Sequence, residues 1–233
     1  MSYPPTPLVG TDAQLHQRGI LSQVYAWMTA GLLVTSAVAS YAASAPIVLN
    51  LLYGNPFTIW LLLLAQIGLV IGLSAAIDRL TPPAAAALFI GYAALNGLTL
   101  SALFLVYTST SIAQAFLATA ATFLVMSFYG ATTKRDLSTV GNLLVMTLIG
   151  FVIGSIVNLF WANSAVYWVL TYLGIAIFIG VTAWDTQQIK GLIQQAHDDT
   201  TARRLAIIGA LKLYLDFINL FVLLLRIFGS HDE

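Results

Sequence analysis

The stretch LYLDFINLFVLLLRIFG, from Leu213 to Gly229, decides the class of this protein. Nearly all of its residues are aliphatic or aromatic, but Asp216 stands among them. A carboxylate at membrane depth costs about 2.5–3.5 kcal/mol on insertion scales, unless it is neutralised, paired or facing water. A second carboxylate, Asp185, ends the preceding apolar stretch in IAIFIGVTAWDTQ. We therefore expect the function at these two acidic residues.

The composition indicates an integral membrane protein. Of the 233 residues, 59% are hydrophobic and 8% are charged, whereas soluble domains carry about 25% charged residues. The formal net charge is zero, and no basic patch or tail for nucleic acid is present. The sequence contains no cysteine, which excludes disulfides, thiolate metal sites and cysteine nucleophiles.

Seven apolar segments are long enough to cross roughly 30 Å of hydrocarbon. They are Ile20–Ala42, Phe57–Ile77, Ala84–Val106, Ile112–Ala131, Gly141–Trp161, Ala165–Trp184 and Ala206–Phe228. The predicted fold class is an all-α integral membrane protein with seven transmembrane helices. We predict a cytoplasmic tail over residues 1–19, a membrane domain over 20–229 and a C-terminal tail over 230–233. The polar connection Thr186–Thr201 is expected to extend a helix and then turn.

The connections between these segments alternate in charge. The uncharged set consists of Ala43–Pro56, Tyr107–Ser111 and Ala162–Ser164. The other set carries basic residues, namely Arg18, Arg79, Lys134, Arg135, Lys190, Arg203 and Arg204. By the positive-inside rule the charged set is cytoplasmic. The N-terminus is therefore predicted in the cytoplasm and, after seven crossings, the C-terminus outside.

Lys212, Asp216 and Asn219 share one face of the last helix, because they are four and three residues apart. Asp185 is expected at a similar height on the preceding helix. Two close carboxylates cannot both ionise cheaply, so we expect them to share a proton and titrate as a pair. Once ionised, their oxygens would suit a transiently bound Ca²⁺. The alternative is that Asp216 pairs with Lys212 and that Asp185 is an interfacial cap.

Three segments together resemble the bacterial branch of the Bax inhibitor-1 family, the transmembrane Bax-inhibitor-motif proteins. They are LYLDFINLFVLLLRIFG, WDTQQIK at Trp184–Lys190 and TTKRDLS at Thr132–Ser138. The resemblance covers essentially the whole chain and implies six helices around a central seventh. It also implies a pH-sensitive calcium leak channel gated by two aspartates, which match Asp185 and Asp216. An arginine at the cytoplasmic end of the second helix is implied as a latch on one aspartate, and Arg79 is the residue available there.

These inferences predict a specific geometry. The carboxyl groups of Asp185 and Asp216 are expected within direct or single-water hydrogen-bond reach, with Arg79 as their nearest cation from another helix. Gln66 stands where some family members have glutamate, which would weaken a cation site. Gln66, Lys212 and Asn219 are predicted to line or support a pathway.

Several other polar and small residues are assigned structural roles. Polar residues within the spans are expected to hydrogen-bond neighbouring helices, namely Asn96, Thr99, Ser101, Asn158 and Asn219. Glycines four residues apart, Gly68 with Gly72 and Gly150 with Gly154, are expected to allow close helix packing. Ser138 is predicted to cap the fifth span. The histidines His16, His197 and His231 lie in tails and loops without metal-ligand spacing.

Functions from different classes are compatible with this pattern. The first is a proton-gated leak for cations, with calcium as the permeant ion and no cofactor. The second is a regulatory membrane protein that binds and restrains a partner such as a membrane-bound protease. A retinal protein is disfavoured, since Lys212 is expected at the cytoplasmic end of its helix and the third span holds no counter-ion. An enzyme is not expected, and the bacterial inner membrane is the expected location.

Overall fold

The protein is described by a computed structural model, which covers residues 9–77, 79–194, 196 and 198–229, with side chains from residue 19 onward. The described ranges contain helices and no strand. The helices are α1 (Val9–Ser44), α2 (Pro46–Tyr53), α3 (Pro56–Ala76), α4 (Pro82–Leu100), α5 (Leu103–Val106), α6 (Ser109–Thr132), α7 (Ser138–Trp161), α8 (Ser164–Gln194) and α9 (Asp199–Phe228).

Seven segments of this fold are long and apolar enough to cross a membrane, which confirms the predicted fold class. Helix α5 continues α4 as one such segment, Pro82–Val106. Helix α8 runs on to Gln194, so the expected extension of this helix is confirmed. Helix α1 begins at Val9, so part of the predicted tail 1–19 is helical. The predicted tail 230–233 lies outside the described residues.

The helix starts follow from local sequence. Helices α2, α3 and α4 each begin with a proline, namely Pro46, Pro56 and Pro82, whose fixed φ suits the first helical turn. The cap predicted from Ser138 is wrong: α7 begins at Ser138 itself, and the Asp136 carboxylate accepts a hydrogen bond from the Ser138 N–H at 2.9 Å. An aspartate placed two residues earlier satisfies the free amide, so the serine hydroxyl is not needed there.

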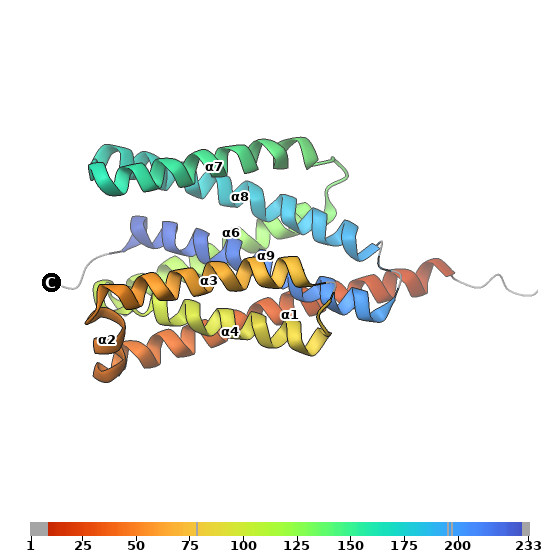
Figure 1. Cartoon of the computed structure of the whole chain (residues 1–233). Helices are drawn as coiled ribbons and strands as arrows, with labels where there is room; N and C mark the ends of the chain where they lie inside the picture. Colours follow the sequence, from red (N-terminus) through yellow and green to blue (C-terminus); the bar gives the residue numbers. More distant parts are fainter. Residues whose placement is uncertain (1–8, 78, 195, 197, 230–233) are drawn as a thin grey trace, which may run out of the picture.

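Helix α9 is the most buried of the seven membrane segments. In its most apolar window 61% of the residues are buried, against none in α7. Figure 1 shows α7 and α8 along one edge of the bundle, α1 and α4 along the other, and α9 between them. Helix α9 packs against α1, α4, α6 and α8, whereas α3 packs chiefly on α4 and α7 on α8. The inner position of α9 explains how this helix can carry a carboxylate away from lipid.

Tyr214 of α9 joins the helices at the centre of the core. Its ring makes edge-to-face contacts with Phe89 and Tyr92 of α4. Its hydroxyl is 2.6 Å from the Thr35 hydroxyl of α1 and accepts from the Asn96 amide at 2.9 Å. One buried polar group therefore ties α1, α4 and α9 together, two residues before Asp216.

Of the four glycines expected to allow close helix packing, Gly154 alone has a close neighbour, Leu170 of α8 at 3.2 Å from an added Cβ. A Cβ atom at Gly68, Gly72 or Gly150 would meet nothing within 4 Å, and one at Gly154 would meet only Leu170. A Cβ at Gly130 of α6, by contrast, would meet the backbone of Ala183 in α8. Glycines four residues apart occur on outward faces of helices as well as on packed faces. The spacing alone therefore did not identify the glycines at which helices approach closely.

Candidate functional site

The two aspartates lie on neighbouring helices that pack against each other. Asp185 is on α8 and Asp216 on α9. Asp185 is 7% exposed and Asp216 is 4% exposed. The structure thus places the two residues that the sequence singled out, both buried, on adjacent helices.

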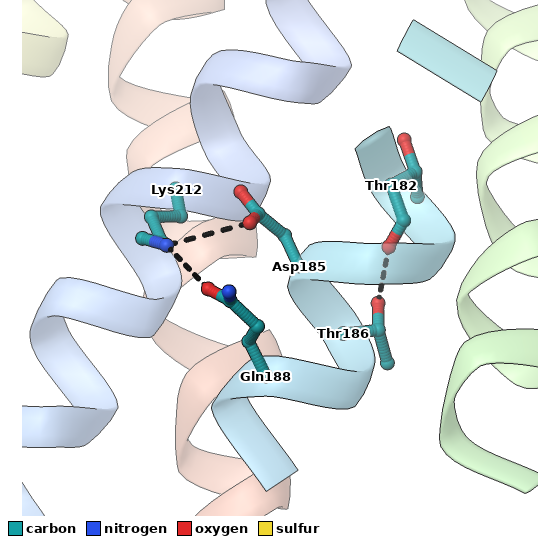
Figure 2. A network of polar contacts seen from close by, with 5 residues as sticks. All are labelled: Thr182, Asp185, Thr186, Gln188 and Lys212. Atoms are coloured by element: carbon teal, nitrogen blue, oxygen red, sulfur yellow. Dashed lines mark hydrogen bonds and ion pairs between the residues drawn. The ribbon is translucent and has the colours of Figure 1, made fainter. Parts of the chain in front are cut away.

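The partner of Asp185 is Lys212, which comes from α9. The Lys212 ammonium donates to a carboxylate oxygen of Asp185 at 3.3 Å and to the Gln188 side-chain oxygen at 3.2 Å. Figure 2 shows the ammonium between these two acceptors, which project from consecutive turns of α8. Lys212 also lies 5.9 Å from the centre of the Trp184 ring. The lysine therefore links α9 to α8.

Asp216 is left without an equivalent partner. Its Oδ2 atom is buried and has no hydrogen-bond partner in the described part of the chain. No hydrogen bond joins the two carboxyl groups among the described residues, so their direct bond is not found, and the single-water arrangement stays a prediction. The alternative pairing of Asp216 with Lys212 is not found either. A lysine can bridge to the neighbouring helix as readily as to its own, and neither expectation considered that partner.

The site lies deeper in α9 than expected. Because α9 begins at Asp199, Asp216 follows the helix start by 17 residues and precedes its last residue, Phe228, by 12. Lys212 is therefore near the middle of the helix, and its expected place at the end of the helix is wrong. The retinal interpretation stays disfavoured, because the third span, Ala84–Val106, holds no counter-ion.

Arg79 contacts neither aspartate in this structure. It follows α3, is exposed, and forms no ion pair in the ranges that the structure describes. Lys212 is the cation that holds Asp185 here, and it was not expected in that role. The latch role of Arg79 stays a prediction for another conformation.

The segment that carries Asp185 is fixed to the α6–α7 connection. Gln187 accepts from the Leu137 N–H at 2.9 Å and donates to the Arg135 carbonyl at 2.8 Å. Lys190 donates to the Ala131 carbonyl at 2.7 Å. WDTQQIK and TTKRDLS, two of the segments behind the family resemblance, therefore bind each other. Both segments were singled out in the sequence, but the hydrogen bonds between them were not predicted.

The opposite face of the same turn is tied to α6 and α1. The Thr186 hydroxyl donates to the Thr182 carbonyl at 2.7 Å, as Figure 2 shows, and lies 3.1 Å from the Ser127 hydroxyl. Ser127 in turn lies 2.5 Å from the Tyr25 hydroxyl. Hydrogen bonds on both sides hold the backbone of α8, so the Asp185 carboxylate is presented from a rigid element.

Gln66 and Asn219, which were predicted to line or support a pathway, both line one cavity of about 750 Å³, and each also makes a local hydrogen bond. Gln66 donates to the Leu95 carbonyl at 3.1 Å and to the Thr99 hydroxyl at 2.5 Å, which joins α3 to α4. Asn219 is exposed and donates to the Leu215 carbonyl of its own helix at 2.8 Å. Ser101 donates within its own segment, to the Leu98 carbonyl at 2.6 Å, and its hydroxyl also lies 3.2 Å from the Tyr53 hydroxyl of α2, which confirms the expected bond to a neighbouring helix. His197 and His231 and the side chain of His16 lie outside what the structure describes.

Comparison with known proteins assigns the chain to a family. The family model described as "Inhibitor of apoptosis-promoting Bax1" matches residues 17–233. The chain belongs to the Bax inhibitor-1 family. It is 51% identical over 212 residues to the inner membrane protein YbhL of Escherichia coli (strain K12), covering 90% of this chain and 91% of that protein. It is 43% identical to a Borreliella burgdorferi protein over 90% and 91% of the two chains. It is 41% identical to a Deinococcus radiodurans protein over 92% of each.

Membership of the Bax inhibitor-1 family confirms the resemblance seen in the sequence. Together with the seven apolar helices it makes the chain a multi-pass membrane protein. In this member of the family, a lysine on the last helix is ion-paired to the acidic residue of the preceding helix.

Proposed function

We propose that the protein is a pH-sensitive leak channel for cations, with Asp185 and Asp216 as pH sensor and gate. Calcium is the proposed permeant ion. No catalytic role is proposed. The observation that carries the proposal is the unequal treatment of the two buried carboxyl groups: Asp185 is ion-paired to Lys212, whereas the Oδ2 atom of Asp216 has no partner in the described part.

Burial without a partner favours the neutral form of a carboxyl group, because removing an ionised carboxylate from water costs far more than removing the acid. With Asp216 protonated, the group of three carries one negative and one positive charge. These two charges are on Asp185 and Lys212, which are already in contact. This state holds α8 and α9 together and is the proposed closed state.

Loss of the proton from Asp216 changes the balance of charges. Two carboxylates then compete for one ammonium, because Lys212 precedes Asp216 by one helical turn and can reach either acid. The link between α8 and α9 weakens, and the uncompensated negative charge draws water and cations into the site. Flux is therefore expected to rise with pH on the side from which Asp216 is titrated.

Calcium suits the ionised site because it prefers carboxylate oxygens. The described residues contain no group of three or more His, Cys, Asp or Glu that could hold a metal. Two carboxylates give a weakly held ion, and weak binding is what conduction requires. Asp185 and Asp216 are proposed to bind calcium only in passing.

Location and orientation complete the proposal. Escherichia coli YbhL is an inner membrane protein by name, and we propose the same bacterial membrane for this chain. By the positive-inside rule the basic connections support a cytoplasmic N-terminus and a C-terminus on the outer side, and we propose this orientation. A reporter fused after Glu233 that is active only in the cytoplasm would overturn this orientation.

The decisive experiment is calcium flux into proteoliposomes across a pH series from 5 to 8, with protein-free liposomes as the control. The expected result is protein-dependent flux that increases with pH. Asp185→Asn and Asp216→Asn are the matched variants, because each keeps the side-chain shape and removes one titrating group. Wild-type pH profiles in both variants would refute the gate.

A regulatory role is the second candidate, with α7 as the relevant feature. None of the residues in the most apolar window of α7 is buried, and the helix packs chiefly on α8. Its outer face is free for lipid or for a membrane protein partner such as a membrane-bound protease. A binding role does not need the aspartates, so partner effects that survive Asp185→Asn together with Asp216→Asn would favour it.

A further inference from the structure

A cavity at the end of the bundle where α9 stops is built differently from the aspartate site. Its volume is about 750 Å³, and α3, α4, α7, α8 and α9 all contribute to its walls. Much of its wall is apolar and includes Phe151, Leu170, Phe178 and Leu223. Polar side chains line it deeper in the bundle, at Gln66, Asn96 and Asn219, and again next to the α7–α8 turn.

Two asparagine amides in this wall have known orientations. The Asn158 side-chain oxygen accepts from the Asn163 N–H at 3.1 Å, and the Asn163 side-chain oxygen accepts from the Val166 N–H at 3.1 Å. Because a backbone N–H can only donate, the oxygen and not the nitrogen must face it in both cases. Both NH₂ groups are therefore left as donors, and neither has an acceptor among the described residues.

Arg226 supplies a positive charge to the same wall. It lies in the last turn of α9, is half-buried, and places its guanidinium carbon 5.1 Å from the centre of the Tyr167 ring. A cation in the last turn complements the helix dipole, which accounts for the charge but not for the donors around it. Arg226 forms no ion pair in the part that the structure describes, and none of the lining residues described is acidic.

The turn that carries the donors is held in an unusual conformation. Ala162, which also lines the cavity, has φ of 48° and ψ of 37°, the left-handed region that non-glycine residues rarely adopt. This conformation ends α7 and brings Asn163 back against Asn158. Backbone strain of this kind persists where the surrounding structure imposes it and is concentrated at functional sites.

Aromatic residues place this end of the bundle at the membrane surface. Trp161 is 80% exposed and Trp168 is 42% exposed, and the two flank the α7–α8 turn. Exposed tryptophans gather at the level of the lipid headgroups. Arg226 and the two amides therefore face headgroups, while the apolar wall of the cavity faces acyl chains.

We propose that this cavity binds an anionic phospholipid. The phosphodiester is held by the Arg226 guanidinium and by the free amide donors of Asn158 and Asn163, and an acyl chain lies against the apolar wall. Planar guanidinium groups bind phosphate through paired, charge-assisted hydrogen bonds. A zwitterionic headgroup is disfavoured, because no described lining residue offers an acceptor charge to its ammonium group.

The test measures bound lipid by native mass spectrometry of the purified full-length chain. The probes are dioleoyl-phosphatidylglycerol and dioleoyl-phosphatidylcholine at equal concentrations. The wild type is expected to prefer phosphatidylglycerol by about tenfold, because both lipids offer the same phosphodiester but only phosphatidylcholine brings a second positive charge close to the Arg226 guanidinium. Arg226→Gln and the double variant Asn158→Ala with Asn163→Ala are expected to lose most of this preference. Lys134→Gln, which removes an exposed cation from the α6–α7 connection, is the control and should keep it.

Equal binding of the two lipids by the wild type would overturn the proposal, as would an unchanged preference in Arg226→Gln. Arg226→Lys is the control for misfolding of Arg226→Gln, because it keeps the charge and should keep part of the preference.

Residues 230–233 contain Asp232 and Glu233, whose carboxylates are a rival anion for the cavity. A preference that appears only after these four residues are deleted would assign the cavity to the chain's own tail and refute lipid as the occupant. Lipid binding and calcium flux are separate measurements, so failure of one leaves the other standing.

Discussion

Lys212 of α9 donates to Asp185 of α8 at 3.3 Å, although Asp216 follows it by only one turn on its own helix. The ion pair therefore links two helices instead of stabilising one. The lysine side chain is 38% exposed, while that of its partner is 9% exposed. The cation can reach water and the anion cannot, so the bridge can open from the lysine side. This asymmetry is the basis of the first three predictions.

Lys212→Met removes the charge and keeps most of the side-chain volume. Asp185 is then buried without its cation, and removing one partner of a buried pair is strongly destabilising. We expect a loss of about 1–3 kcal/mol, less than for a fully enclosed pair because Lys212 is partly exposed. Thermal unfolding in detergent measures this loss, with Lys134→Met as the exposed control. In proteoliposomes the same variant should conduct calcium at low pH. Flux equal to that of the wild type at low pH would contradict the proposed role of the Lys212–Asp185 ion pair in the closed state.

Asp216→Asn imitates the protonated aspartate at every pH. Since the amide is neutral, Lys212 stays with Asp185 and the proposed closed state persists. Calcium flux is expected to remain at its low-pH level up to pH 8, with unfolding temperature close to that of the wild type. An Asp216→Asn protein whose flux still climbs with pH would show that another group is the sensor.

Asp185→Asn breaks the ion pair from the other side. Lys212 then becomes free to pair with Asp216, so the link from α9 to α8 is lost and flux should be raised and nearly independent of pH. The double variant with Asp216→Asn should resemble Asp185→Asn, because Lys212 lacks its partner on α8 in both proteins, so the two substitutions are not additive. Flux is measured under the same conditions for the wild type, both single variants and the double variant, which completes a double-mutant cycle. Additive effects of the two substitutions on flux would show that Asp185 and Asp216 act independently.

Gly130→Ala tests the contact that positions the WDTQQIK segment. A methyl group at Gly130 would meet the backbone of Ala183, which cannot move without shifting α8. Overpacking of this kind typically costs about 1–3 kcal/mol. Gly150→Ala is the matched control, because a Cβ there meets nothing within 4 Å. Unfolding temperatures should fall for the first variant only, and equal stabilities would contradict the close approach of α6 and α8.

Asp198 starts α9 and gives its stability a pH dependence. Its carboxylate accepts from the Thr201 N–H at 2.8 Å and from the Thr201 hydroxyl at 2.7 Å. These hydrogen bonds lower the pKa of Asp198 below its usual value. A lowered pKa means that the cap contributes stability above the unfolded pKa of about 4 and loses it as the pH falls through the folded value.

Asp198→Ala should therefore lower the unfolding temperature at pH 6 and have a smaller effect at pH 3. Asp198→Asn is the control, since asparagine also caps helices but does not titrate. It should remain near the wild type at pH 6 and lose less stability on acidification. A pH-independent difference between Asp198→Ala and the wild type would rule out the charged cap.

Much of this protein is determined by its sequence. The apolar lengths define the seven membrane segments, because backbone groups in lipid must be satisfied within a helix. The cost of a carboxylate at membrane depth singled out Asp185 and Asp216, and the two lie on packed helices, α8 and α9. The polar pattern of WDTQQIK and TTKRDLS carried the family resemblance, although it did not reveal that the two segments bind each other.

Only the tertiary structure determined which group each charged side chain contacts. Lys212 is one turn from Asp216 in sequence, yet the rotation of α9 against α8 sets its ammonium beside Asp185 and Gln188. The same is true of the glycines, where the four-residue spacing at Gly68 and Gly72 occurs on an outward face while Gly130 approaches Ala183. Periodicity along one helix defines which residues share a face. It carries no information on which neighbour that face meets, because the rotation of each helix is set by the packing of all the others.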